Sequence, residues 1–232
     1  MAKLTLWFLQ ASRSIRIAWL LEELGLDYDV KFADREAGLA PPAFKKEAGG
    51  LGKFPMLQDG DLKIQESGCI VEWAQPRSMA KAPHANRNFR YLCDTYDKEH
   101  RLLPAVGDKR RYEILYWVHA AEAMWALHGI AILYVRWFQK DGDVAKTEQG
   151  LSKNIINDMD YLEEHLSKGN GKFLVGNAVS AADCMMAFSA AFILARELGV
   201  KPASYPRSQQ YVQDCEATET YKKAVQKTGH KL

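Results

Sequence analysis

The stretch Gly52-Lys53-Phe54-Pro55-Met56-Leu57-Gln58-Asp59-Gly60-Asp61-Leu62-Lys63-Ile64-Gln65-Glu66-Ser67 decides how the first part of the chain folds. It contains two short apolar runs separated by Asp59-Gly60, and Asp-Gly between apolar runs is typical of a tight hairpin. Glu66-Ser67 follows the second run with residues that favour a helix start. The stretch therefore predicts two antiparallel strands and then a helix.

The residues before this hairpin predict two further strand and helix pairs. Residues 3–9 form a short apolar strand pattern, and a helix ending at Gly25 presents one apolar face. A second strand is expected over Tyr28–Ala33, and Pro41-Pro42 favours the start of another helix. The predicted order is βαβαββα within the first hundred residues. The apolar face of the first helix is formed by Ile17, Leu20, Leu21 and Leu24.

From about Leu103 onward the chain shows only helical periodicity. The stretch 112–138 is apolar, and Ile155, Met159, Leu162 and Leu166 recur at helical spacing. Ser180 and Asp183 have the spacing of a capping box at a helix start. The expected fold class is therefore an α/β N-terminal domain over residues 1–98, followed by an all-α helix bundle over 99–232.

Composition and charge exclude several classes of function. The 232 residues include 31 Lys and Arg against 29 Asp and Glu, so the basic excess of nucleic-acid-binding proteins is absent. The four cysteines form no Cys-x-x-Cys pair, so we expect neither a metal site nor disulfides. The apolar run 114–135 contains His119, Glu122 and His128, which favours a buried bundle helix over a transmembrane span.

Taken in order, these motifs resemble those of the serine-type glutathione transferases. They are most similar to the fungal members described as membrane-associated and to related bacterial members. The resemblance spans almost the whole chain and implies a thioredoxin-like N-terminal domain. The strings that carry it are Ser12-Arg13-Ser14-Ile15-Arg16, Ala40-Pro41-Pro42 with Lys45-Lys46, Gly52-Lys53-Phe54-Pro55, Glu66-Ser67-Gly68-Cys69-Ile70 and Gly176 to Asp183.

The resemblance implies a glutathione site on the N-terminal domain. Lys53 would bind the glycyl carboxylate, and Pro55 in cis would let the Phe54 main chain pair with the cysteinyl part of the tripeptide. Glu66 and Ser67 would hold the γ-glutamyl end. From the residues alone, the favoured interpretations are a proline at a strand start for Pro55 and simple helix capping for Glu66-Ser67.

The resemblance also assigns the activation of the thiol and the electrophile pocket. Ser12, with Ser14 as the alternative, would stabilise the thiolate, and Arg13 would add positive potential. Either serine is also a good N-cap for the first helix. Tyr112, Tyr116 and His119 would line the electrophile pocket, although aromatic residues at helical spacing are also typical of a bundle core. These three belong to an aromatic-rich stripe with Trp117, Met124 and Trp125.

Two stretches depart from the family pattern. Ala48-Gly49-Gly50-Leu51 stands where an Asn-Pro loop is usual. Residues 76–90 interrupt the third helix and carry four basic and no acidic residues, Arg77, Lys81, Arg87 and Arg90. Pro76 and the lack of apolar periodicity predict an exposed inserted loop between helical flanks at about 67–75 and 90–97. This helix is the one that the family uses for dimer contact.

The expected function is transfer of the glutathione thiolate to small apolar electrophiles in detoxification, with glutathione peroxidase activity as a side reaction. Glutathione would be a co-substrate and no cofactor is expected. The N-terminus lacks the pattern of a signal peptide, so we expect a cytoplasmic protein, free or peripherally held at an intracellular membrane. The resemblance implies that it is a homodimer. The alternative is a transferase-like glutathione-binding or regulatory protein with little turnover.

Overall fold

The computed structural model describes residues 3–71 and 91–232, which form two compact units. The first unit comprises the chain up to Gly107 together with Thr218–Leu232, and the second comprises Asp108–Ala217. The expected division between residues 98 and 99 therefore lies inside the first unit. The last fifteen residues, expected in the helical domain, also belong to the first unit because their helix packs on its first helix.

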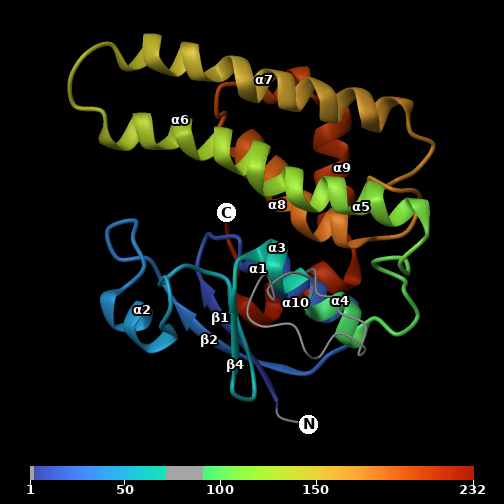
Figure 1. The fold of residues 1–232 in the computed structure, drawn as a ribbon. Helices are drawn as coiled ribbons and strands as arrows, with labels where there is room; N and C mark the ends of the chain where they lie inside the picture. The colour runs from blue at the N-terminus through green and yellow to red at the C-terminus, as the bar shows by residue number, and fades with distance from the viewer. Residues whose placement is uncertain (1–2, 72–90) are drawn as a thin grey trace. The chain divides into compact units, whose positions relative to one another are not determined.

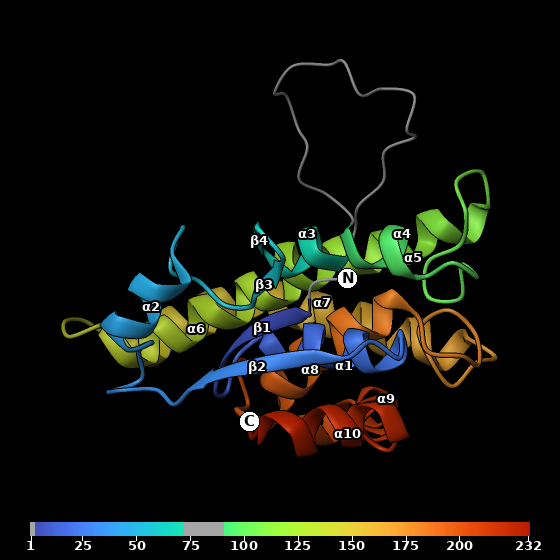
Figure 2. The same cartoon turned by 90° about the horizontal axis from the view of Figure 1, so that it is seen from below.

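The first unit is built on a four-stranded mixed sheet of order β2-β1-β3-β4 (Figure 1). Strands β1 (Leu4–Leu9) and β2 (Tyr28–Ala33) are parallel and lie side by side in Figure 2. Strands β3 (Met56–Asp59) and β4 (Leu62–Gln65) form an antiparallel hairpin, with β3 antiparallel to β1. The hairpin turn places Gly60 at φ 57°, a conformation that glycine adopts without steric cost. The predicted βαβαββα order is confirmed.

Five described helices belong to this unit. The amphipathic sequence of α1 buries residues 14–21 against its surroundings, and α10 packs on α1. The Trp19 indole donates a hydrogen bond to Thr220 Oγ1 at 3.1 Å, and its ring meets Tyr221 edge to face at 5.3 Å. The helices are α1 (Ser14–Glu23), α2 (Pro42–Ala48), α3 (Ser67–Val71), α4 (Tyr91–Tyr96) and α10 (Glu219–Thr228).

Helices α3 and α4 confirm part of the expected helical flanks of the inserted segment. The predicted loop at 76–90 lies outside the described residues. Where the chain is described again, the hydroxyl groups of Tyr91 and Tyr96 both donate to Asp59 Oδ2, the latter at 2.6 Å. Two tyrosines of α4 are thus bonded to the residue that opens the β3–β4 turn.

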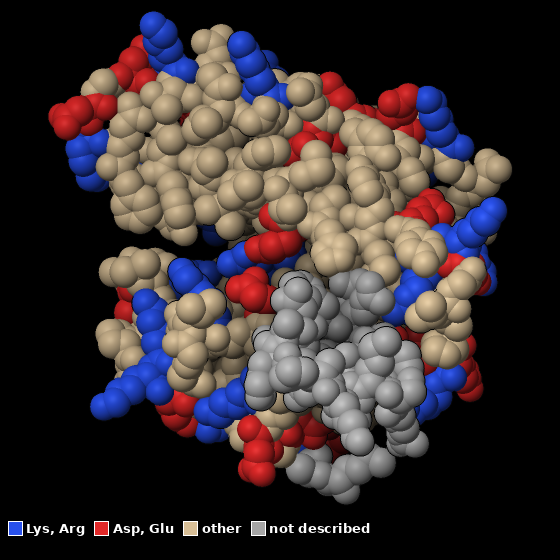
Figure 3. Space-filling view, in the orientation of Figure 1, with Lys and Arg blue, Asp and Glu red and all other residues tan. Residues whose placement is uncertain are grey.

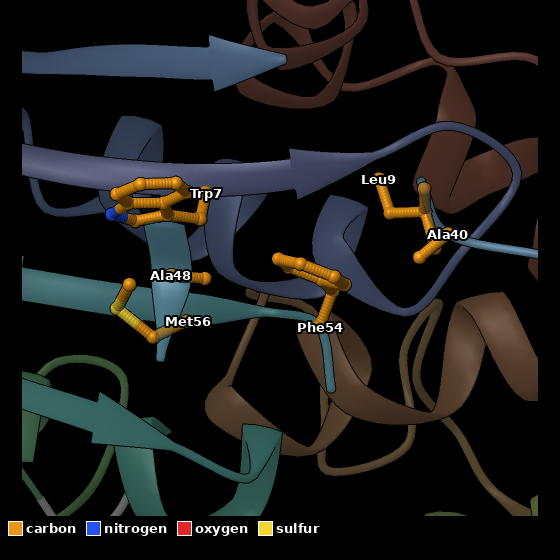
Figure 4. Close-up of a cluster of buried hydrophobic side chains, with 6 residues drawn as sticks. All are labelled: Trp7, Leu9, Ala40, Ala48, Phe54 and Met56. Atoms are coloured by element: carbon orange, nitrogen blue, oxygen red, sulfur yellow. The ribbon is translucent and has the colours of Figure 1, made fainter. Parts of the chain in front are cut away.

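An apolar cluster packs between the sheet and α2 (Figure 4). Phe54 lies between the Trp7 and Leu9 side chains of β1 and stacks on Phe44 with ring centroids 4.7 Å apart. The side chain of Phe54 is therefore part of the core, which fixes the chain immediately before β3. The buried members are Trp7, Leu9, Ala40, Ala48, Phe54 and Met56.

The second unit is helical in its regular secondary structure, as predicted. The single apolar stretch read from the sequence forms α5 (Lys109–Ala120), a π-helical segment (Ala121–Ala126) and α6 (Leu127–Phe138). The π segment widens the helix, and the buried Ser189 hydroxyl donates to the Ala121 carbonyl at 2.8 Å. The other helices are α7 (Val144–Lys168), α8 (Ala181–Ala195), a 3-10 turn (Pro202–Ser204) and α9 (Pro206–Glu216).

Among the described helices, Lys109–Phe138 alone is long and apolar enough to cross a bilayer. Of its most apolar 18-residue window, 44% is buried, and a core helix of a bundle passes the same test of length and composition. Helices α7 and α8 cover part of this long helix. A broad uncharged surface lies over α5 and α6 in Figure 3, where acidic and basic side chains otherwise alternate.

Asp183 organises the start of α8. Its fully buried carboxylate accepts hydrogen bonds from Ser180 N and Ser180 Oγ, both at 2.8 Å, which confirms the predicted capping box. It also accepts from Leu174 N at 3.0 Å and Tyr211 OH at 3.2 Å. Burial raises the pKa of Asp183, and these four donors oppose the rise.

Replacement of Asp183 by Ala should destabilise the helical unit by about 3 kcal/mol or more, because four buried donor groups would lose their acceptor. Urea unfolding followed by circular dichroism measures the loss. Asp183→Asn is the matched control, since it retains one oxygen for Leu174 and Tyr211 and should lose less. A loss below about 1 kcal/mol for the Ala variant would contradict this account.

Candidate functional site

Sheet topology brings three separate parts of the sequence to one end of the sheet in the first unit. Strands β1 and β4 both run antiparallel to β3, so the ends of β1 and β4 and the start of β3 share one end of the sheet. Trp7 pairs with Met56, and Met56 pairs with Gln65. Ser12, Phe54-Pro55 and Glu66-Ser67, which follow or precede these pairs, are therefore neighbours at that end.

Arg16 connects the first and third of these segments. Its side chain is fully buried in α1, and Nη1 donates a hydrogen bond to Ser67 Oγ at 3.0 Å. Because the arginine uses an acceptor lone pair of that hydroxyl, the Ser67 hydrogen remains suited to donation toward an anionic group. Ser67 is itself only 4% exposed, at the start of α3.

The Arg16 contact is absent from the sequence-based assignment, in which Arg16 served only as part of a motif. A signal was present, since Arg16 interrupts an otherwise apolar helical run from Ile15 to Leu21. A charged residue at a core position of a helix indicates a specific polar partner, because burying an unpaired charge is costly. The identity of that partner, 51 residues away, does not follow from local pattern.

Positive charge gathers at the start of α1. Burial is the main cause that lowers the pKa of Arg16, and the nearby Arg13 guanidinium lowers it further. Arg13 and Arg16 thus bring two basic side chains to the start of α1.

Ser12 and Ser14 form a linked pair at the turn before α1. Ser12 Oγ donates to the Leu9 carbonyl at 2.6 Å, lies 2.9 Å from Ser14 Oγ and accepts from Ser14 N at 3.1 Å. Ser14 has no exposed surface, and its hydroxyl accepts from Leu9 N at 3.4 Å. Ser12 retains 7% exposure. Both predicted serines are therefore buried, and of the two only Ser12 keeps some exposed surface.

The peptide bond between Phe54 and Pro55 is cis, as predicted. The β1–β3 register ends at the pair Trp7–Met56, so the main chain of Phe54 lies beyond the paired part of the sheet. Its side chain is buried at 6% exposure in the cluster of Figure 4. Because the side chain is buried and the main chain lies beyond the β1–β3 pairs, the Phe54 backbone is suited to pair with an extended ligand.

Lys53 and Glu66 are exposed residues on either side of this backbone segment. Among residues 3–71 and 91–232, neither forms an ion pair. Glu66 has φ 71°, a conformation that is uncommon for residues other than glycine, asparagine and aspartate. Such backbone strain persists where the surrounding structure imposes it, and it is frequent at ligand sites.

The predicted electrophile residues share one face of α5. Tyr112 and Tyr116 are 63% and 44% exposed, and His119 is also exposed. Tyr116 packs edge to face on Tyr161 of α7, at 6.2 Å between ring centroids. Burial and the Tyr161 contact raise the pKa of Tyr116 to about 12. These residues therefore form an aromatic surface rather than part of the bundle core.

In the described part of the chain, no group of three or more His, Cys, Asp or Glu residues is arranged to hold a metal ion. Cys93, Cys184 and Cys215 are buried and unlinked by disulfides.

Two family profiles match the chain. Residues 2–75 match the profile described as Glutathione S-transferase, N-terminal domain, and residues 127–227 match Glutathione S-transferase, C-terminal domain. The N-terminal match ends just before the inserted segment and contains Ser12, Lys53, Phe54, Pro55, Glu66 and Ser67.

Fungal and bacterial proteins are among the relatives of known sequence or structure. Glutathione S-transferase 3 of Schizosaccharomyces pombe is 29% identical over 196 residues, which cover 80% of this chain and 72% of the relative. A glutathione S-transferase structure from Actinobacillus pleuropneumoniae is 30% identical with a TM-score of 0.78, covering 98% of this chain and 93% of that one. A glutathione transferase homologue from Lodderomyces elongisporus, solved with two glutathione molecules per subunit, is 20% identical with a TM-score of 0.72, covering 97% and 99%.

Proposed function

Because the chain belongs to the glutathione S-transferase family, we propose that it binds glutathione at the shared end of β1, β3 and β4 and transfers the thiolate sulfur to small apolar electrophiles. The observation that carries this proposal is the hydrogen bond from the buried Arg16 to Ser67. This bond leaves a hydroxyl donor at the same end of the sheet as the Ser12 turn and the Phe54 main chain, which lies beyond the β1–β3 pairs. The glutathione seen in the fungal homologue from Lodderomyces supports the same ligand.

The γ-glutamyl end of glutathione carries a carboxylate and an ammonium group. Ser67 Oγ would donate its hydrogen to the carboxylate, since Arg16 already donates to that oxygen. The main-chain N–H groups at the start of α3 have no partner within the helix and would add further donors. The exposed Glu66 carboxylate would pair with the ammonium group.

The rest of the tripeptide would extend along the segment before β3. The cysteinyl residue pairs with the main chain of Phe54, as an added strand does at a sheet edge. The glycyl carboxylate then meets Lys53, an exposed cation with no ion pair in the described part of the chain. Glutathione is a co-substrate in this scheme, and no cofactor takes part.

Ser12 would activate the thiol by stabilising its anion. A free thiol with a pKa near 8.5 is only a few per cent ionised at pH 7, and lowering this pKa by about two units requires about 2.7 kcal/mol. The Ser12 hydrogen would turn from the Leu9 carbonyl to the sulfur, and the N-terminus of α1 with Arg13 would add positive potential. Attack on an aryl chloride then forms the carbon–sulfur bond, expels chloride and releases the thiol proton to solvent.

The aromatic surface of α5 would receive the electrophile. Tyr112, Tyr116 and His119 offer flat and exposed rings for an apolar substrate. The same chemistry in the cell would detoxify reactive compounds, and a bound thiolate would also reduce peroxides as a side reaction. We place the enzyme in the cytoplasm as a homodimer, free or peripherally bound to an intracellular membrane, and light scattering and cell fractionation test these assignments.

Turnover with glutathione and a chloronitroarene tests the enzyme against a binding protein of the same fold. The expected result is formation of the conjugate at a rate that saturates in both substrates. Hydroperoxide reduction coupled to glutathione oxidation tests the side reaction separately. Tight glutathione binding without conjugation of any chloronitroarene would favour the regulatory alternative.

Glu66→Ala should weaken glutathione binding by about 1 to 3 kcal/mol, because one charged contact to the γ-glutamyl ammonium is lost. Calorimetry should show a dissociation constant at least several-fold higher. The substitution retains the strained backbone at φ 71°, so thermal stability should change little. Unchanged affinity would show that the γ-glutamyl end binds elsewhere.

Ser12→Ala should raise the pKa of the bound thiol and reduce turnover at pH 6.5 about tenfold or more, while leaving glutathione affinity nearly intact. The thiolate absorbance as a function of pH reports the pKa directly. Ser14→Ala is the matched control, because it removes the hydroxyl of a residue with no exposed surface. Compared with Ser12→Ala, it should lower thermal stability more and raise the pKa of the bound thiol less. The opposite pattern would assign activation to Ser14.

A further inference from the structure

Gln65 binds the loop that precedes Lys53 through both ends of its side-chain amide. Its Oε1 accepts a hydrogen bond from Leu51 N at 2.9 Å, and its Nε2 donates to the Gly49 carbonyl at 3.1 Å. The same Gly49 carbonyl accepts from Gly52 N at 3.2 Å. One side chain of β4 thus supplies the hydrogen bonds that a paired strand would give to this loop.

The loop requires such support because glycine dominates it. Gly49, Gly50 and Gly52 have φ values of 79°, 58° and 60°, and chains with several glycines lose much conformational entropy when they become ordered. This is the stretch where the usual Asn-Pro of the family is replaced. A Cβ atom built on Gly50 would lie 2.4 Å from Gln65 Oε1, so the amide occupies space that only glycine leaves open.

Lys63 reinforces the contact from the same face of β4, since residues two apart in a strand point to the same side. Its Nζ donates to the Ala48 carbonyl at 3.2 Å and to the Glu47 carbonyl at 3.4 Å. These carbonyls end α2, where a cation is favoured by the helix dipole. Lys63 and Gln65 together bind three successive carbonyl groups and one N–H of the chain leading to Lys53.

We propose that Gln65 is a positioning residue that sets the location of Lys53 and thereby the preference for the glycyl end of glutathione. This inference rests on the proposed function. Gln65 is covalently adjacent to Glu66, so its amide joins the γ-glutamyl side of the site to the loop that carries Lys53. Loss of the amide should release the loop and weaken recognition of the glycyl carboxylate, while Glu66 and Ser67 continue to hold the other end.

A comparison of glutathione with γ-glutamylcysteine, which lacks the glycyl residue, tests this proposal. The dissociation constant of γ-glutamylcysteine divided by that of glutathione, both measured by calorimetry, reports recognition of the glycyl end. Gln65→Met keeps the length of the side chain but removes both hydrogen bonds, and it should reduce the ratio about threefold to tenfold. Lys53→Ala should reduce it at least as much, and the double variant should match Lys53→Ala alone because both act on one contact.

Gln58→Met is the matched control, since Gln58 lies in the same hairpin and donates to the Gly60 carbonyl at 3.0 Å, away from the loop. It should leave the ratio unchanged. If Gln65→Met does not fold, Gly50→Ala displaces the amide from the loop side and should reduce the ratio in its place. Equal weakening of both ligands by Gln65→Met would overturn the proposal while preserving the glutathione site. Absence of glutathione binding by the unmodified protein would overturn the proposed function itself.

Discussion

The antiparallel pairing of β3 with both β1 and β4 is the constraint on which the candidate site depends. It places the end of β1, the start of β3 and the end of β4 at the same end of the sheet. The three segments bring together different groups: the Ser12 hydroxyl, the Phe54 main chain beyond the β1–β3 pairs, and the Glu66 carboxylate with the Ser67 hydroxyl. A register shift of one residue would turn the Phe54 side chain out of the core and remove its main chain from this end.

The buried Arg16 fixes the third segment relative to the first. Removing a guanidinium from water is costly, so its position implies that the fold compensates for it with hydrogen bonds such as that to Ser67. Ser67, which accepts this hydrogen bond, is the residue proposed to hold the γ-glutamyl carboxylate, so Arg16 would act on the ligand through the orientation of Ser67.

Most of the fold could be predicted because local sequence patterns indicate its strands, turns and helices. The Asp59-Gly60 turn, the helical periodicity of the second unit and the capping box at Ser180 each depend on residues within a few positions. The contact of Arg16 with Ser67, the amide contacts of Gln65 and the return of α10 to α1 join residues far apart in the sequence. Their partners follow from tertiary packing, which no single local pattern encodes. The cis bond at Pro55 was predicted from the family resemblance and not from the residues, because a proline at a strand start explains the same residue.

The two ends of the proposed ligand are held by different physical means. At the γ-glutamyl end, Arg16 and Ser67 are buried at 0% and 4% exposure, so their hydrogen bond is shielded from water and salt. At the glycyl end, the proposed contact is the exposed Lys53, which follows a glycine-rich loop that Lys63 and Gln65 support. Exposed charges are screened, and long side chains lose entropy when held. The buried end should therefore set the location of the ligand, while the loop and its amide contacts adjust how closely the ligand must resemble glutathione.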